Sequence, residues 1–227
     1  MKKVILIFLN IIPILFVFAF LFLPPALYHF KTYDVEKLLE ISIDIPCKTR
    51  FEVEDIYTYE EKEKLVKESF KLRTYDEETF EKYIDSFAIS ESGSYAVCIA
   101  LTRASGYCVS FYSFSGDFLK SFIINNGGSM SLEFYDNYLN IYSVRGGVLF
   151  SIDCDTYACN VYSVLESSEN RNLHDSLGNP RKNIGEFMYE LKGKNSAAIL
   201  FDRCTKLIKT NTVSGESVVL YDSKKDN

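Results

Sequence analysis

Residues 86–124, SFAISESGSYAVCIALTRASGYCVSFYSFSGDFLKSFII, contain the pattern that sets the fold class of this chain. Apolar residues recur in it at every second position, which is the period of a β-strand. Clusters of Gly, Ser, Asp and Arg interrupt these runs, and such residues favour turns. We therefore predict consecutive antiparallel strands joined by short hairpins. The four strands are expected near 86–90, 94–102, 107–114 and 117–124.

The same alternation of strands and turns recurs twice further along the chain, which indicates internal repeats. The three predicted units are 86–125, 129–165 and 185–222. A polar insertion, 166–184, separates the last two and is predicted to be a solvated loop. The strands of the later units are expected near 130–135, 138–144, 147–154 and 157–164, and near 186–191, 196–202, 204–210 and 216–221.

A family resemblance rests on the segment Val109–Phe122, VSFYSFSGDFLKSF, and on its weaker copies Leu149–Val164 and Thr205–Tyr221. These segments resemble the outer hairpins of the β-propeller superfamily, in the loose WD40/NHL-like sense of four-stranded blades. The Gly-His and Trp-Asp signatures of true WD40 repeats are absent. The resemblance implies an open or incomplete propeller, because known propellers close with four or more blades. Closure would need help from 43–57 and the helices, or from a second chain.

Residues 26–85 are predicted to form a juxtamembrane region of short helices and strands. Residues 43–57 alternate enough to suggest one or two strands. Thr58 and Glu61 have the spacing of a capping box, and so do Thr74 and Glu77, so we expect a helix after each pair. Residues 223–227 are expected to be a disordered tail.

The first 25 residues are predicted to anchor the chain in a membrane. Val4 to Leu23 is a run of 20 uncharged residues, long enough as a helix to cross a bilayer of about 30 Å. Cleaved signal peptides have shorter apolar regions that end at small residues, and this run continues past Ala19. A cleaved signal and a buried core helix remain the alternatives.

The predicted orientation places the amino terminus in the cytoplasm and the body outside the cell membrane. Lys2 and Lys3 precede the span, while Lys31 and Lys37 follow it, so the charge bias is small. Long domains that follow a signal-anchor are translocated largely regardless of charge. We therefore expect a single-pass protein with an extracytoplasmic body.

Composition excludes several classes of function. The net charge of −6 argues against a nucleic-acid binder, which needs a basic face. The two histidines, His29 and His174, fall in no visible catalytic arrangement, and no motif for a phosphate loop or a zinc site is present. The sequence therefore predicts a non-enzyme without a cofactor or a metal.

Two sets of residues are candidate site features. Cys154 and Cys159 flank a predicted hairpin tip and could form a disulfide across it; buried free thiols are the alternative. Tyr135, Tyr138 and Tyr142 cluster around another hairpin and are candidate binding-surface aromatics, because tyrosine is amphipathic and has few rotors.

These features lead to three hypotheses. The first is a membrane-anchored module whose propeller-like body binds a protein or a glycan. The second is a membrane-tethered hydrolase that uses paired carboxylates, chosen among Glu133, Asp136, Asp153 and Asp155. The third is a structural subunit of a membrane complex. Whether the chain forms a homo-oligomer is left open.

Overall fold

The computed structural model describes residues 30–31, 39–70, 75–76, 82–101, 106–125, 128–194 and 203–223. Two compact units divide the chain. In the unit made of 1–32 and 74–79, the structure describes one antiparallel pair, β1 (Phe30–Lys31) with β4 (Tyr75–Asp76). The predicted span from Val4 to Leu23 lies outside the described residues. Among those described, no helix is long and apolar enough to cross a membrane.

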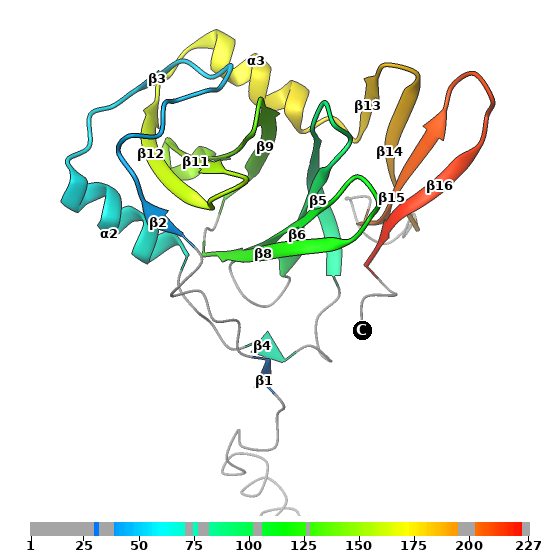
Figure 1. The fold of residues 1–227 in the computed structure, drawn as a ribbon, viewed down its shortest axis with the longest axis horizontal. Coiled ribbons are helices and arrows are strands. Elements are labelled where there is room, and N and C mark those ends of the chain that lie inside the picture. The colour runs from blue at the N-terminus through cyan, green and yellow to red at the C-terminus, as the bar shows by residue number, and fades with distance from the viewer. Residues whose placement is uncertain are drawn as a thin grey trace, which may run out of the picture. The chain divides into compact units, whose positions relative to one another are not determined.

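The other unit is mainly β, as predicted, and its strands pair consecutively in three runs of four (Figure 1). The first run is β5 (Lys82–Ile89), β6 (Tyr95–Leu101), β7 (Gly106–Tyr112) and β8 (Phe118–Ile124). The second run is β9 (Met130–Tyr135), β10 (Tyr138–Ser143), β11 (Val148–Asp153) and β12 (Ala158–Val164), with the short helix η3 (Val144–Gly146) before β11. The third run is β13 (Arg181–Ile184), β14 (Phe187–Lys194), β15 (Arg203–Asn211) and β16 (Ser217–Asp222).

These runs combine into two sheets. The first and third runs join where Cys204 of β15 pairs with Ile84 of β5, which makes one eight-stranded sheet. The second run forms a six-stranded sheet with β2 (Glu40–Ile41) and β3 (Val53–Glu54), both of which pair with β12. In the part of the chain that is described, the runs are therefore not separate blades around a closed ring.

The first predicted helix is present, whereas the described residues of the second, 75–76 and 82–85, lie in strands. Helix α2 (Tyr59–Ser69) begins with the predicted capping box: the Thr58 hydroxyl accepts from the Glu61 amide, and the Glu61 carboxylate accepts from the Thr58 amide. Of the helix predicted after Thr74, residues 77–81 lie outside the described residues, and the predicted helical positions Tyr83 and Ile84 belong to β5. Ile84 is buried, and its backbone pairs with β6 and β15, so at this position tertiary pairing favours a strand over a helix.

The polar insertion is not a solvated loop. It contains helix α3 (Ser168–Leu177) followed by β13. The Ser167 hydroxyl caps α3 by accepting from the Asn170 amide at 3.1 Å. Leu173 and Leu177, four residues apart, pack against a small apolar cluster that includes Phe51. These two leucines provide enough apolar surface to hold α3 on the body.

The main core is shared between the two sheets. Phe122 of β8 and Phe150 of β11 belong to one buried cluster although they lie in different sheets. Phe70, at the end of α2, lies edge-on to both, with ring centroids 6.3 Å from Phe122 and 5.0 Å from Phe150. The two sheets are therefore held together by a common apolar layer that α2 closes at one end.

Candidate functional site

A loop covers the face of the second-run sheet that points away from the shared core. This cover loop, residues 42–52, leaves the edge of β12 where the Ser42 amide donates to the Cys159 carbonyl at 3.0 Å. It returns to that edge where the Leu165 amide donates to the Glu52 carbonyl, also at 3.0 Å. Its two ends therefore attach at opposite ends of β12, about 20 Å apart along the strand, because a strand rises about 3.3 Å per residue.

A row of buried polar side chains lies under the cover loop, one from each strand of the second run. Glu133 and Asn140 are register partners, as are Asn140 and Ser151, and Ser151 and Asn160. Each of the four is at most 1% exposed. Buried polar groups are costly unless they are hydrogen-bonded, so this polar row needs partners from the loop.

Glu133 holds the far end of the cover loop. Its carboxylate accepts from Thr49 Oγ1 at 2.6 Å and from Arg50 Nε at 2.5 Å. Asn140 donates to the same carboxylate at 3.2 Å and to the Lys48 carbonyl at 2.8 Å. Both carboxylate oxygens are therefore occupied by the loop and its neighbours.

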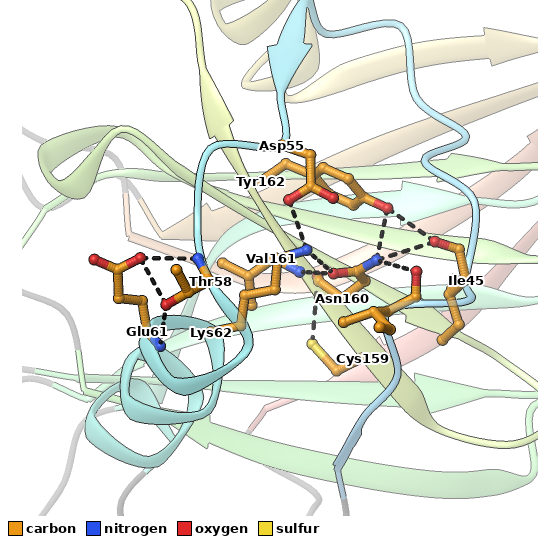
Figure 2. A network of polar contacts seen from close by, with 10 residues as sticks. Ile45, Asp55, Thr58, Glu61, Lys62, Cys159, Asn160, Val161 and Tyr162 are labelled. Carbon is orange, nitrogen blue, oxygen red and sulfur yellow. Dashed lines mark hydrogen bonds and ion pairs between the residues drawn. The ribbon is translucent and has the colours of Figure 1, made fainter.

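Lys62 and Asn160 hold the near end of the loop (Figure 2). Lys62 is 2% exposed, and its ammonium donates to Asn160 Oδ1 at 2.9 Å and pairs with Asp55 at 2.6 Å. Asn160 Nδ2 and the Tyr162 hydroxyl both donate to the Ile45 carbonyl, at 3.1 and 2.8 Å. Burial raises the pKa of the Tyr162 phenol, which keeps this donor protonated.

The polar row therefore holds the irregular backbone of the cover loop in place. It satisfies loop carbonyls and amides that no strand reaches, which is what a loop packed on a sheet requires. Among the described side chains of the row, Asn140 Oδ1 and Ser151 Oγ have no hydrogen-bond partner. Of the strands predicted within 43–57, only β3 is present. Over the rest of this segment the loop backbone forms hydrogen bonds with side chains of the sheet and not with a neighbouring strand.

Each of the four carboxylates considered for hydrolysis has its own partner within the fold. Asp136 pairs with Lys48 at 3.1 Å. Asp153 accepts from two backbone amides of its own turn, and Asp155 accepts from Asn137 Nδ2 at 2.8 Å. With Glu133 bound to the cover loop, each of the four has a contact that supports the fold.

His174 lies on α3 rather than in a solvated loop. It shares a hydrogen bond with Ser131 of β9, and its ring lies edge-on to Tyr142 at 5.9 Å. Burial raises the pKa of the nearby Asp85 carboxyl, and His174 partly opposes that shift. Ser131 is fully buried, so the pair attaches α3 to β9 and does not offer a nucleophile to solvent.

The structure separates the three predicted surface tyrosines. Tyr135 and Tyr138 face each other as register partners at the tip of the β9–β10 hairpin, and Tyr135 is exposed. Lys48 lies 5.7 Å from the ring centroid of Tyr138. Tyr142 instead packs against Phe51 of the cover loop, with ring centroids 4.9 Å apart. Only two of the three therefore share a surface.

Cys154 and Cys159 are free thiols, so the predicted disulfide is not formed in this structure. The register places Cys159 opposite Ile152, two residues away from the position that would face Cys154. Both side chains pack against the shared core, and burial raises the pKa of the Cys154 thiol to about 12. The described residues contain no group of three potential metal ligands.

The most exposed apolar surface lies on two hairpins that the sequence marks for their resemblance to propeller hairpins but not as a binding surface. Phe114 and Phe118 belong to the β7–β8 hairpin and are 69% and 59% exposed; Val218 of β16 is 61% exposed. Leu119, Val213 and Val219, also exposed, lie on the same two hairpins. Scattered exposed apolar residues are ordinary, whereas a group on neighbouring hairpins is a candidate interaction surface.

Lys209 connects the two hairpins. It is the register partner of Val218 and of Tyr189, so these three side chains share one face of the third run. Its ammonium lies 5.9 Å from the ring centroid of Phe114 and 3.9 Å from that of Phe187. We call Phe114, Phe118, Lys209 and Val218 the hairpin surface.

Lys182, on β13, has an unusual environment. Its ammonium donates to the Phe87 carbonyl of β5 and lies 4.5 Å from the centroid of the Phe87 ring. Burial, and to a lesser degree repulsion by Arg50, lowers its pKa to about 8. The folded chain therefore releases this proton more readily than the unfolded chain does.

This lowered pKa predicts a pH dependence of stability. Between about pH 8 and the ordinary lysine pKa near 10.4, the unfolded chain binds the extra proton, so Lys182 makes unfolding less favourable as the pH rises. Urea unfolding at pH 7.5 to 10 should show wild type gaining stability relative to Lys182→Met. The comparison cancels the titration of tyrosines and cysteines common to both. Parallel pH profiles would contradict the assignment.

Comparison with family models, with curated proteins and with solved structures finds no match for this chain.

Proposed function

We propose that this protein is a non-enzymatic, membrane-anchored binding module whose extracytoplasmic body docks a protein segment on the hairpin surface. The anchor is the predicted span from Val4 to Leu23. The body contributes three runs of four strands, of which the first and third carry the exposed hairpins. The observation that carries the proposal is Lys209, set among exposed apolar side chains from two hairpins.

The chemistry of the hairpin surface defines the segment. Phe114, Phe118 and Val218 lose contact with water when apolar side chains cover them, at about 25 cal/mol per Å² of apolar area buried. Lys209 forms no ion pair with a carboxylate of the described residues, so its charge is free to pair with a partner. The complementary segment is therefore both apolar and acidic.

Binding is favoured over the hydrolase because the candidate carboxylates are already engaged. Glu133 is buried under the cover loop, and Asp153 organises its own turn. A glycosidase needs two carboxyl groups that face each other across a substrate. The contacts of these residues support the fold and leave binding as the better-supported role.

The test uses the purified full chain in a neutral detergent and two labelled peptides of equal length. One peptide alternates Leu and Phe with Asp, and the other alternates Leu and Phe with Lys. Fluorescence anisotropy should show saturable binding of the acidic peptide, at least about tenfold tighter than that of the basic peptide. The double variant Phe118→Ser/Val218→Ser should bind it at least about tenfold more weakly, because it removes two exposed apolar contacts.

A matched control replaces exposed apolar residues elsewhere. The variant Ile43→Ser/Ile56→Ser changes two side chains that are 58% and 61% exposed but lie outside the hairpin surface. It should bind the acidic peptide as wild type does. Equal binding of both peptides, or binding of an oligosaccharide such as chitohexaose without either peptide, would contradict the proposal.

A further inference from the structure

The outer edges of the two sheets differ in how they are covered. An edge strand presents unpaired backbone amides and carbonyls, to which another strand can add. In the six-stranded sheet, β2 and β3 cover the edge of β12, and β9 at the other end lies against β5 and α3. The eight-stranded sheet ends at β13 and β8. Two of the four residues of β13 (Arg181–Ile184) are cations, a common protection against pairing with another chain.

The outer edge of β8 is covered over one half only. At its carboxyl end, the Asn125 amide donates to the Ser69 carbonyl of α2 at 2.6 Å. At its amino end, Phe118 and Leu119 are both more than half exposed. Among the described residues, only β7 forms backbone hydrogen bonds with 118–121. We call 118–121 the open edge, because its outward backbone groups have no partner in the described fold.

A β-bulge gives the open edge two different faces. The register pairs Phe118 with Tyr112 and shifts at the next position. There it pairs Lys120 with Phe111, so that Leu119 is the extra residue of the bulge. Because Phe111 and Tyr112 are consecutive, their side chains point to opposite faces of the sheet. Phe118 and Lys120 therefore also lie on opposite faces, one aromatic and the other cationic.

Lys120 gives the open edge a charge that the described fold does not neutralise. Its ammonium lies 4.1 Å from the centroid of the Tyr157 ring, and it forms no ion pair with a carboxylate of the described residues. Opposite charges on one face of neighbouring strands attract, so an added strand is favoured when it places an acid beside Lys120. An apolar residue is favoured beside Phe118. Since side chains alternate between faces, the strand that fits alternates apolar and acidic residues.

We propose that the partner segment binds as an extended β-strand added to the open edge of β8. Main-chain hydrogen bonds hold the segment, and its alternating apolar and acidic side chains select it. This inference rests on the proposed function and specifies the conformation in which the hairpin surface takes its partner. Phe118 belongs both to the hairpin surface and to the open edge, so the two are continuous.

The first experiment compares the acidic peptide with two N-methylated forms, by fluorescence anisotropy on the full chain in neutral detergent. One form is N-methylated at its Asp residues, and the other at its Leu and Phe residues. Successive amides of an extended strand point to opposite sides, so only one form keeps the donors that face β8. One form should therefore bind at least about tenfold more weakly than the unmodified peptide, and the other within about twofold of it.

A second experiment locates the added strand by hydrogen–deuterium exchange with mass spectrometry. The unmodified acidic peptide should slow exchange at 118–121 at least about tenfold, because outward amides of β8 become hydrogen-bonded. The edge of β13, Arg181–Ile184, is the control. It should exchange at the same rate with and without the peptide.

A variant pair tests the charge of the open edge. Lys120→Met should weaken binding of the acidic peptide about threefold, through loss of one cross-strand ion pair. Lys192→Met is the control, since Lys192 also lies in a strand but already pairs with Glu190 at 3.2 Å. It should leave binding unchanged. Equal binding by both variants would overturn the pairing of Lys120 with an acid of the segment.

The outcomes distinguish this inference from the proposed function. If the unmodified acidic peptide does not bind, the proposed function fails and the inference fails with it. If that peptide binds but both N-methylated forms bind equally well or are weakened equally, strand addition is overturned and the hairpin surface remains the site. Binding without added protection at 118–121 would have the same consequence.

Discussion

Replacing Asn160 with leucine is expected to lower the free energy of unfolding by about 3 kcal/mol. The substitution removes the acceptor of the buried Lys62 ammonium and the donor to the Ile45 carbonyl. Leucine has the same number of side-chain heavy atoms and the same branch at Cγ, so the substitution leaves no cavity and the loss comes from unsatisfied polar groups. Urea unfolding followed by circular dichroism measures it.

Ser151→Ala is the matched control for this prediction. Ser151 is the neighbour of Asn160 in the polar row and is equally buried, but its hydroxyl has no hydrogen-bond partner among the described residues. Its removal should change the free energy of unfolding by less than about 0.5 kcal/mol or stabilise the fold. Similar losses in both variants would show that the row does not work through the contacts seen here.

Replacing Phe122 with alanine is expected to cost about 3–5 kcal/mol. Phe122 is fully buried, and its ring lies edge-on to Phe111 at 5.3 Å and to Phe70 at 6.3 Å. Because this core is shared by both sheets, both sheets should lose stability together, in one unfolding transition. Thermal unfolding followed by tyrosine fluorescence and by circular dichroism should give coincident midpoints.

Phe118→Ala is the control on the same strand. Phe118 is largely exposed and contacts Tyr112 at 5.9 Å between ring centroids. It should cost less than about 1 kcal/mol, because little apolar area is lost from the core. If Phe122→Ala split the unfolding into two separate transitions, the two sheets would not share a core.

The strands of the second run show what a sequence predicts well. The sequence places strands near 130–135 and 138–144, and the structure has them at Met130–Tyr135 and Tyr138–Ser143. Alternating burial and a short turn are local signals, so they can be found without knowing the rest of the fold. The capping box at Thr58 is local in the same sense.

Long-range contacts explain what could not be predicted. The joining of the first and third runs depends on the pairing of Ile84 with Cys204, which are 120 residues apart and carry no mutual signal. Likewise, nothing near Asn160 shows that it satisfies the Ile45 carbonyl. The first strand of the third run, Arg181–Ile184, was hidden because its residues are mostly polar.

In the candidate site, too, the sequence predicts local features and misses contacts between distant segments. The tyrosines at the β9–β10 tip were found as an aromatic cluster, but Tyr142 turns inward against Phe51. Lys209 was not singled out, since a lysine in an edge-like strand usually serves to prevent aggregation. Its position among aromatic rings becomes visible only when the third run meets the β7–β8 hairpin.

The most direct test of the account is a charge swap at Lys209. The variant Lys209→Glu is titrated with the acidic and the basic apolar peptides, and affinity is measured by fluorescence anisotropy. The account predicts that the preference reverses, with the acidic peptide binding at least about tenfold more weakly than to wild type and the basic peptide binding more tightly. Unchanged affinities for both peptides would contradict the claim that the hairpin surface is where this protein binds its partner.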